Sequence, residues 1–210
     1  MSREDQARWD ERFRTGSHAG ANPDPFLFQL EDYWELLPEH GRALDLACGP
    51  GRNAVWFGEK VKEKAQICAE ERGIRPDLEP DWSITGFDIS LEGLRKARAL
   101  ACERAVHLDL ACVDLDTPPP CEGRFDLILC FSFLDRELFS WIRSALRPGG
   151  LVVYKTYTVE SMRFTGGPRN ERFLLRPQEL LEYFRDFRVL LYQETVKDRG
   201  VAQMIARKKQ

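Results

Sequence analysis

The chain has 210 residues, 43% of them hydrophobic, and carries a formal net charge of -3 at pH 7. This size suits a single domain over 1–210, in which we expect a helical N-terminal cap over 1–40 and a core over 41–210. The slightly acidic charge gives no general attraction to nucleic acid or to an anionic membrane surface. Small-molecule partners are therefore favoured.

Six cysteines are spread singly through the sequence, and no C-x-x-C pair occurs. Most lie in apolar stretches, which predicts reduced thiols in the core of a cytoplasmic protein. The charged N-terminal segment has no apolar signal region, and no stretch approaches the run of about 18 apolar residues that spans a bilayer. The three histidines stand apart from one another, so we expect no metal site, and we expect His107 to lie in the core.

The predicted elements begin with two helices, over 2–14 and 26–37, which an Asn-Pro-Asp-Pro break separates. From residue 42 onward, short apolar segments alternate with amphipathic ones, a pattern typical of a parallel sheet covered on both faces. The predicted parallel strands are 42–47, 82–87, 106–113, 125–131 and 151–157.

Helices are expected between these strands. The first helix follows a glycine-rich loop within residues 43–54 and stops at Gly73. Ser90 caps the second helix, which runs to about residue 103. The third covers 134–146 and is closed by Arg147-Pro148-Gly149-Gly150 ahead of the fifth strand. After a short helix over 178–184, two final strands, 187–196 and 201–207, are spaced as an antiparallel hairpin.

The segment ALDLACGPGRNA, residues 43–54, joins an apolar strand to a helix through two glycines. Its Gly49-x-Gly51-x-x-Ala54 spacing matches the dinucleotide fingerprint, which also requires an acid at the end of the next strand. Asp88 ends that strand and can accept two hydrogen bonds from vicinal ribose hydroxyls. The loop thus predicts a ligand with a ribose, and a nicotinamide-dependent oxidoreductase is one alternative.

Further residues carry a family resemblance. The segment Asp45-Leu46-Ala47-Cys48-Gly49-Pro50-Gly51 resembles the first motif of the class I S-adenosylmethionine methyltransferases, with Ala47 in place of the first glycine. Segments 86–90, 113–115 and 147–150 resemble the second motif, the third motif and the turn into the fifth strand. The acid before the loop favours this family over a dehydrogenase.

This resemblance implies a fold and a cofactor. The implied fold is an α/β, Rossmann-like, seven-stranded class I methyltransferase sheet with helices on both faces and a C-terminal antiparallel hairpin. The implied cofactor is S-adenosyl-L-methionine, and the implied reaction is methyl transfer. A scaffold that binds the cofactor without turnover is a further alternative.

A narrower resemblance concerns the acceptor. The Gly-Arg-Asn continuation of the loop, Arg-Pro-Gln-Glu-Leu over 176–180 and the ending over 202–208 resemble the tellurite-resistance type of small-molecule methyltransferase. The Trp-Asp-Glu-Arg-Phe segment over 9–13 also resembles the cap of thiopurine methyltransferases. These likenesses imply a thiol, a chalcogen oxyanion or another soft nucleophile as acceptor. About fifteen extra residues around 62–81 depart from the pattern.

The resemblance also assigns cofactor contacts. Gly49 and Gly51 would admit the methionine part of the cofactor, and Asp45 would fix the loop or reach the amino group. Asp88 would bind the ribose, and Ile89 would pack on the adenine. The alternatives are a tight turn without a ligand for the loop, a local cap for Asp45 and a helix cap for Asp88.

The remaining assignments lie on other segments. Asp114 and Leu115 would meet the adenine edge, although Asp114 could equally be a solvated carboxylate. The Phe131 carbonyl could hold the cofactor amino group, and Trp9 and Ala47 complete the implied cofactor set. No catalytic base is identified. Candidates for contact with the acceptor are Tyr154, Tyr157, Arg172, Arg176 and Arg12, and the arginines over 166–176 would suit an anionic acceptor.

Overall fold

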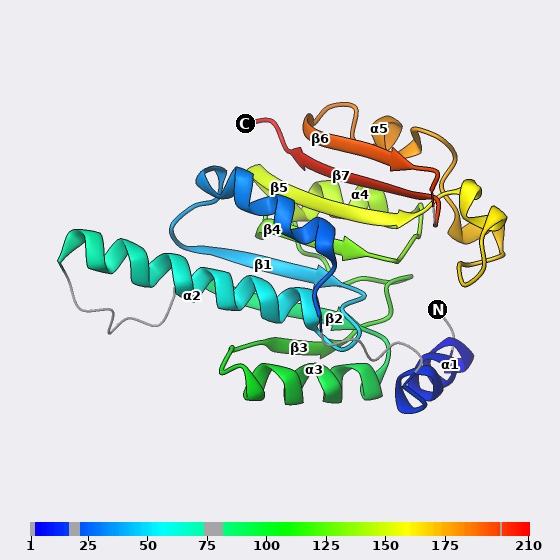
Figure 1. Ribbon diagram of the computed structural model, residues 1–210, viewed down its shortest axis with the longest axis horizontal. Coiled ribbons are helices and arrows are strands. Elements are labelled where there is room, and N and C mark those ends of the chain that lie inside the picture. The colour runs from blue at the N-terminus through cyan, green and yellow to red at the C-terminus, as the bar shows by residue number, and fades with distance from the viewer. Residues whose placement is uncertain (1–2, 17–21, 74–81, 198) are drawn as a thin grey trace. The chain divides into compact units, whose positions relative to one another are not determined.

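The computed structural model describes residues 3–16, 22–73, 82–197 and 199–210. The chain divides into two units, one of Met1–Asp24 with Pro38–Thr117 and the other of Pro25–Leu37 with Pro118–Gln210. The strand order is β3-β2-β1-β4-β5-β7-β6 in a seven-stranded sheet (Figure 1). This order confirms the predicted Rossmann-like sheet, in which the last two strands are antiparallel.

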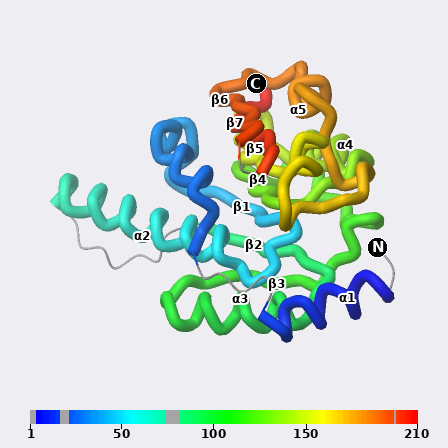
Figure 2. Tube along the Cα trace, turned by 45° about the vertical axis from the view of Figure 1, so that its right-hand side comes forward, coloured from blue at the N-terminus to red at the C-terminus, as the bar shows by residue number. Residues whose placement is uncertain are grey.

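Unit 1 alternates strands and helices after an N-terminal helix. Its elements are α1 (Arg3–Arg14), β1 (Gly41–Leu46), α2 (Arg52–Arg72), β2 (Trp82–Asp88), α3 (Leu91–Glu103) and β3 (Asp109–Cys112). β1 pairs with β2 and β2 with β3, both in parallel. The helix α1 packs against α3, and Figure 2 shows it beside one end of that helix.

Both predicted helix ends of this unit are confirmed. Gly73 adopts a left-handed φ of 66° at the end of α2, and its N–H donates to the Ala69 and Glu70 carbonyls. The Ser90 hydroxyl caps α3 by accepting a hydrogen bond from the Gly93 N–H.

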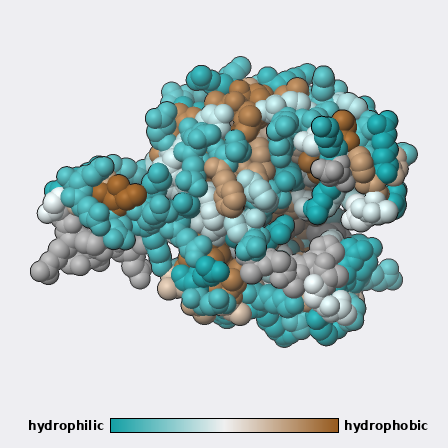
Figure 3. Space-filling model, in the orientation of Figure 1, coloured by the Kyte–Doolittle hydropathy of each residue, from teal (hydrophilic) through white to brown (hydrophobic). Residues whose placement is uncertain are grey.

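The second half of α2 projects beyond the strands of unit 1 (Figure 1). Buried residues of α2 are concentrated before residue 62, and Ile67 is exposed. The space-filling view shows this projection as largely hydrophilic, with a small hydrophobic patch (Figure 3). The extra residues predicted over 62–81 therefore lengthen α2 up to Arg72, and positions 74–81 lie outside the described residues.

Unit 2 contains the other four strands. Its elements are η1 (Pro25–Leu36), β4 (Phe125–Phe131), α4 (Leu138–Ala145), β5 (Leu146–Tyr157), η2 (Val159–Arg163), η3 (Glu171–Phe173), α5 (Glu179–Tyr183), β6 (Arg188–Thr195) and β7 (Val201–Arg207). β4 is buried along its whole length and pairs in parallel with β5. β7 pairs with both β5 and β6 in antiparallel fashion.

Two predicted boundaries are wrong because of local hydrogen bonds. The third strand begins at Asp109 rather than at residue 106, because Ala105 has a φ of 51° and the Val106 N–H still bonds to the Ala101 carbonyl. The helix expected over 134–146 begins at Leu138. An Asp135 carboxylate oxygen accepts the Glu137 N–H and thus holds a turn before the helix.

The segment Arg147–Gly150 is not a turn before the fifth strand but part of β5. The pairing shifts there, from Phe125 opposite Leu146 to Leu127 opposite Leu151, so the segment bulges. Arg147 holds the bulge by donating to both carboxylate oxygens of Asp126, at 3.1 and 2.9 Å.

Two expectations about side-chain burial are also corrected. The His107 side chain is 87% exposed, because it precedes β3 instead of lying within it. All six cysteines are free, but only Cys48, Cys121 and Cys130 are buried.

No helix of the described ranges has both the length and the hydropathy needed to cross a membrane.

Candidate functional site

The glycine-rich loop leaves β1 through a series of left-handed residues. Ala47, Gly49 and Gly51 have φ angles of 53°, 51° and 74°. Glycine adopts this conformation freely, whereas a side chain strains it. The structure thus explains the glycines at 49 and 51, and it shows that Ala47 occupies a position where glycine would be relaxed.

The same glycines also permit close packing within unit 1. A Cβ atom at Gly51 would lie 2.7 Å from the Ala97 Cβ in α3. A Cβ atom at Gly49 would lie 3.0 Å from the Phe13 ring in α1. The loop therefore packs closely against both α1 and α3.

Asp88 ties the end of β2 to this loop. Its Oδ2 accepts the Gly49 N–H at 2.8 Å, and its Oδ1 accepts the Ser90 N–H at 2.8 Å. Burial raises the pKa of Asp88 above its usual range, although both backbone hydrogen bonds favour the ionised form. The residue predicted to bind ribose is thus also the residue that orders the loop and the start of α3.

Asp45 lies at the end of β1 and is only 2% exposed. Its Oδ2 has no hydrogen-bond partner among the described residues. Burial raises the pKa of Asp45 to about 7, the Ala54 N–H lowers it and the charge of Asp88 raises it further. A buried carboxylate oxygen without a partner is unfavourable, so this position is suited to a cationic ligand group.

The predicted adenine-side residues follow β2 and β3. Ile89 is buried, and its carbonyl accepts a hydrogen bond from the Gln6 side chain at 3.0 Å. Leu115 is also buried, and Asp114 forms a turn in which its Oδ1 accepts the Asp116 N–H at 3.0 Å. The carboxyl ends of parallel strands meet at one sheet edge, where such folds bind ligands.

The helix α1 is held at this edge by residues that sequence reasoning missed. Asp10 Oδ1 accepts the Ser90 hydroxyl at 2.5 Å and the Glu92 N–H at 3.0 Å. Phe13 is 5% exposed, and its carbonyl accepts a hydrogen bond from the Lys96 ammonium. The three-residue spacing of Asp10 and Phe13 on one helix face is the signal that could have found them.

The predicted residues Trp9 and Arg12 stack on this same helix. The Arg12 guanidinium lies 4.9 Å from the centre of the Trp9 ring, and that ring stacks on Phe13 at 5.9 Å. The cation–π contact gives Trp9 and Arg12 a structural partner in each other.

In unit 2, the predicted site residues lie in different surroundings. Phe131 ends β4 and is buried. Tyr154 is fully buried, and its hydroxyl donates to the Phe133 carbonyl at 2.9 Å, so it belongs to the core in this structure. Burial raises the pKa of Tyr154 well above its ordinary value. Tyr157 lines a cavity. The Arg172 guanidinium lies 6.0 Å from the centre of the Phe173 ring.

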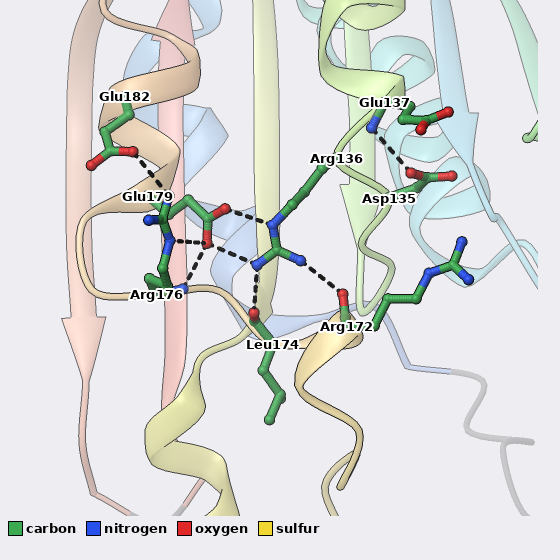
Figure 4. A network of polar contacts seen from close by, with 8 residues as sticks. All are labelled: Asp135, Arg136, Glu137, Arg172, Leu174, Arg176, Glu179 and Glu182. Carbon is green, nitrogen blue, oxygen red and sulfur yellow. Dashed lines mark hydrogen bonds and ion pairs between the residues drawn. The ribbon is translucent and has the colours of Figure 1, made fainter.

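Arg176 belongs to an ion-pair cluster around Glu179 (Figure 4). Arg136 donates to both oxygens of Glu179, at 2.7 and 2.9 Å, and to the Leu174 carbonyl at 2.8 Å. Burial raises the pKa of Glu179, but hydrogen bonds from Arg136 and the Arg176 N–H outweigh this and lower it. The Arg-Pro-Gln-Glu-Leu motif thus has a structural role in unit 2.

Two further observations concern the kind of site. Among the described residues, no group of three or more His, Cys, Asp or Glu side chains gathers as metal ligands. The glycine-rich loop, the acid at the end of β2 and the strand order together define a Rossmann-like nucleoside-binding class of protein.

The family model for the methyltransferase domain matches residues 23–197, and the chain therefore belongs to this family. Class I members of this kind take S-adenosylmethionine as methyl donor. Among curated proteins, the chain is 27% identical over 169 residues to the uncharacterized protein UNK4.09 of Schizosaccharomyces pombe, a match covering 70% of this chain and 50% of that protein. The chain thus spans about half the length of the curated relative it matches.

Solved structures of the same fold cover most of the chain. The protein of "Conversion of a Disulfide Bond into a Thioacetal Group during Echinomycin Biosynthesis" is 17% identical, with a TM-score of 0.68, and 97% of this chain and 92% of that chain are covered. TehB from Haemophilus influenzae is 20% identical, with a TM-score of 0.60 and coverages of 87% and 62%. An S-adenosylmethionine-dependent methyltransferase from Methanosarcina mazei is 15% identical, with a TM-score of 0.61 and coverages of 90% and 99%.

Proposed function

We propose that this chain binds S-adenosylmethionine in unit 1 and transfers its methyl group to a small-molecule acceptor. The observation that carries the proposal is the buried Oδ2 of Asp45, which has no partner among the described residues. It lies in the acid position before a glycine loop, where a cationic amino group would supply the missing partner. A neutral or anionic ligand would leave this carboxylate uncompensated.

We assign the cofactor contacts of unit 1 by chemistry. Asp45 pairs with the cofactor ammonium, and the loop of Gly49 and Gly51 surrounds the methionine part. Each carboxylate oxygen of Asp88 accepts one backbone N–H and keeps capacity for a ribose hydroxyl. Ile89 contributes apolar surface to the adenine.

When bound, S-adenosylmethionine supplies a methyl carbon that its positively charged sulfur activates toward displacement. The chain has to hold the cofactor, align the acceptor and exclude water. A thiolate or a chalcogen oxyanion already offers a lone pair, so it requires no proton removal. Such soft acceptors fit a chain without an identified base, and the resemblance to the tellurite-resistance type favours them.

Isothermal titration calorimetry with S-adenosylmethionine and S-adenosylhomocysteine tests the proposal. We expect dissociation constants in the micromolar range, which correspond to binding free energies on the order of -8 kcal/mol. We expect no binding of NAD. Asp45→Asn should weaken binding by about tenfold or more, because a hydrogen bond to a charged group is lost. Asp32→Asn removes an exposed carboxylate of η1 and serves as the control. Binding of NAD without either sulfur compound would overturn the proposal.

A further inference from the structure

Unit 2 contains a cavity of about 120 Å³ beside the end of β5. Tyr157 lines it from the end of β5, Ser161 from η2, Gly166 and Gly167 from the next loop, and Arg199 from the segment before β7. None of the described lining residues is acidic, and Arg199 contributes a permanent positive charge. The lining therefore favours a negatively charged occupant.

Ser161 gives this cavity a buried polar group with unused capacity. The residue is 1% exposed, and its Oγ has no hydrogen-bond partner among the described residues. Its backbone is already engaged, because the Ser161 N–H donates to the Thr158 carbonyl at 2.9 Å. A Cβ atom at Gly167 would lie 3.4 Å from this Oγ, so a side chain there would pack against the hydroxyl.

The neighbouring arginines are engaged elsewhere. Arg163 pairs with Glu160 at 2.7 Å, and Arg169 donates to the Met162 and Phe164 carbonyls at 2.6 and 2.9 Å. Arg199 is different, because within the described ranges its guanidinium forms no ion pair. Arg199 lies outside the loop over 166–176, whose arginines we expected to suit an anionic acceptor.

Backbone packing fixes the segment of Arg199 next to η2. Gly200 has a φ of 61°, and a Cβ atom there would lie 2.3 Å from the Ser161 nitrogen. The Thr158 N–H also donates to the Gly200 carbonyl at 3.0 Å. This close approach places Ser161 of η2 and Arg199, which precedes β7, on the lining of the same cavity.

We propose that this cavity binds an oxyanion group, a carboxylate, sulfonate or chalcogen oxyanion, through the Arg199 guanidinium and the Ser161 hydroxyl. Since a water molecule occupies about 30 Å³, a cavity of about 120 Å³ has room for a group of roughly four to five heavy atoms. Charge-assisted hydrogen bonds are the strong interactions available to such a group. The identification of this anion as part of the methyl acceptor rests on the proposed function.

Titration of the ¹⁵N-labelled chain with sodium selenate, at constant ionic strength, tests the site by NMR. We expect saturable shifts of the Gly166 and Gly167 amide signals. Arg199→Gln and Ser161→Ala should each weaken selenate binding by about fivefold or more, as expected for the loss of one charge-assisted or buried hydrogen bond. Arg163→Gln removes the same charge from η2 and should leave the affinity within about twofold.

Several outcomes would overturn the inference. Shifts that do not saturate, or equal losses in the Arg163 and Arg199 variants, would show only diffuse attraction to positive charge. Mercaptoacetate should displace selenate and neutral 2-mercaptoethanol should not, so displacement by both would contradict a site for an anionic acceptor. S-adenosylmethionine titrated into the same samples separates the two proposals. Binding of the cofactor without selenate refutes the anion site alone, and the reverse result refutes the proposed function alone.

Discussion

Replacing Asp45 by asparagine should stabilise the chain while weakening its affinity for the cofactor. Burial holds the pKa of Asp45 at about 7 in the folded chain. An unfolded aspartate titrates near about 3.9, and each pH unit between the two values corresponds to about 1.4 kcal/mol. The ionised side chain therefore lowers the free energy of unfolding by as much as about 4 kcal/mol at pH above 7.

The sign of this effect gives it a pH signature. Between about pH 4 and pH 7 the folded chain retains a proton on Asp45 that the unfolded chain has released. Wild-type stability thus falls as the pH rises through this window, and asparagine removes the fall. Urea denaturation between about pH 5 and pH 8 should show the stability difference growing with pH by about 2–3 kcal/mol. Each kcal/mol of this gain corresponds to a melting temperature raised by about 2–4 °C.

The cofactor should offset part of this difference. At about 100 times the wild-type dissociation constant, S-adenosylmethionine would stabilise the wild type by about 2.7 kcal/mol and an Asp45→Asn variant that binds tenfold more weakly by about 1.4 kcal/mol. Asp32→Asn serves as the control for removal of a carboxylate, and its effect should not grow over the same window. An Asp45→Asn variant that is less stable at pH 8, or whose gain is the same at pH 5 and pH 8, would refute the buried-charge argument.

Other substitutions test the surrounding packing. Ala47→Gly should raise the free energy of unfolding, measured by urea titration, by about 1 kcal/mol, because it relieves a left-handed φ. As the control, Ala65→Gly at an exposed position of α2 should lower this free energy by about as much. Phe13→Ala should remove hydrogen-exchange protection from α1 and leave the strands protected, and uniform loss would contradict its local role. Arg136→Met should cost about 3 kcal/mol, and adding Glu179→Leu should recover most of it; a double variant as unstable as the single one would refute the pairing argument.

Much of the fold could be predicted because its signals are local. β4 is apolar at every position except Asp126, and Gly73 and Ser90 mark helix ends through their own conformation or hydroxyl. The bulge at Arg147–Gly150 could not be predicted in this way. It depends on Asp126, a partner 21 residues away, whose carboxylate fixes the arginine.

The site was predictable to the same extent. Asp45 and Asp88 could be placed together because parallel strands bring their carboxyl ends to one edge. Asp10 and Phe13 were missed because their partners lie about 80 residues further along the chain, at Ser90 and Lys96. Apart from the three-residue spacing of Asp10 and Phe13 within α1, such contacts leave little pattern in a single sequence.

Two buried carboxylates of this chain differ in a way that separates a structural role from a ligand site. Glu179 and Asp45 are 1% and 2% exposed, so burial disfavours the charge of each. Glu179 has Arg136 as a bidentate partner, and its pKa is lowered; Asp45 has an oxygen without a partner among the described residues, and its pKa is raised. The first charge is compensated within the fold, whereas the second is not, and we propose that the ammonium group of the cofactor compensates it. On this proposal, binding and stability are coupled at Asp45, because the buried charge that destabilises the free chain would favour the complex.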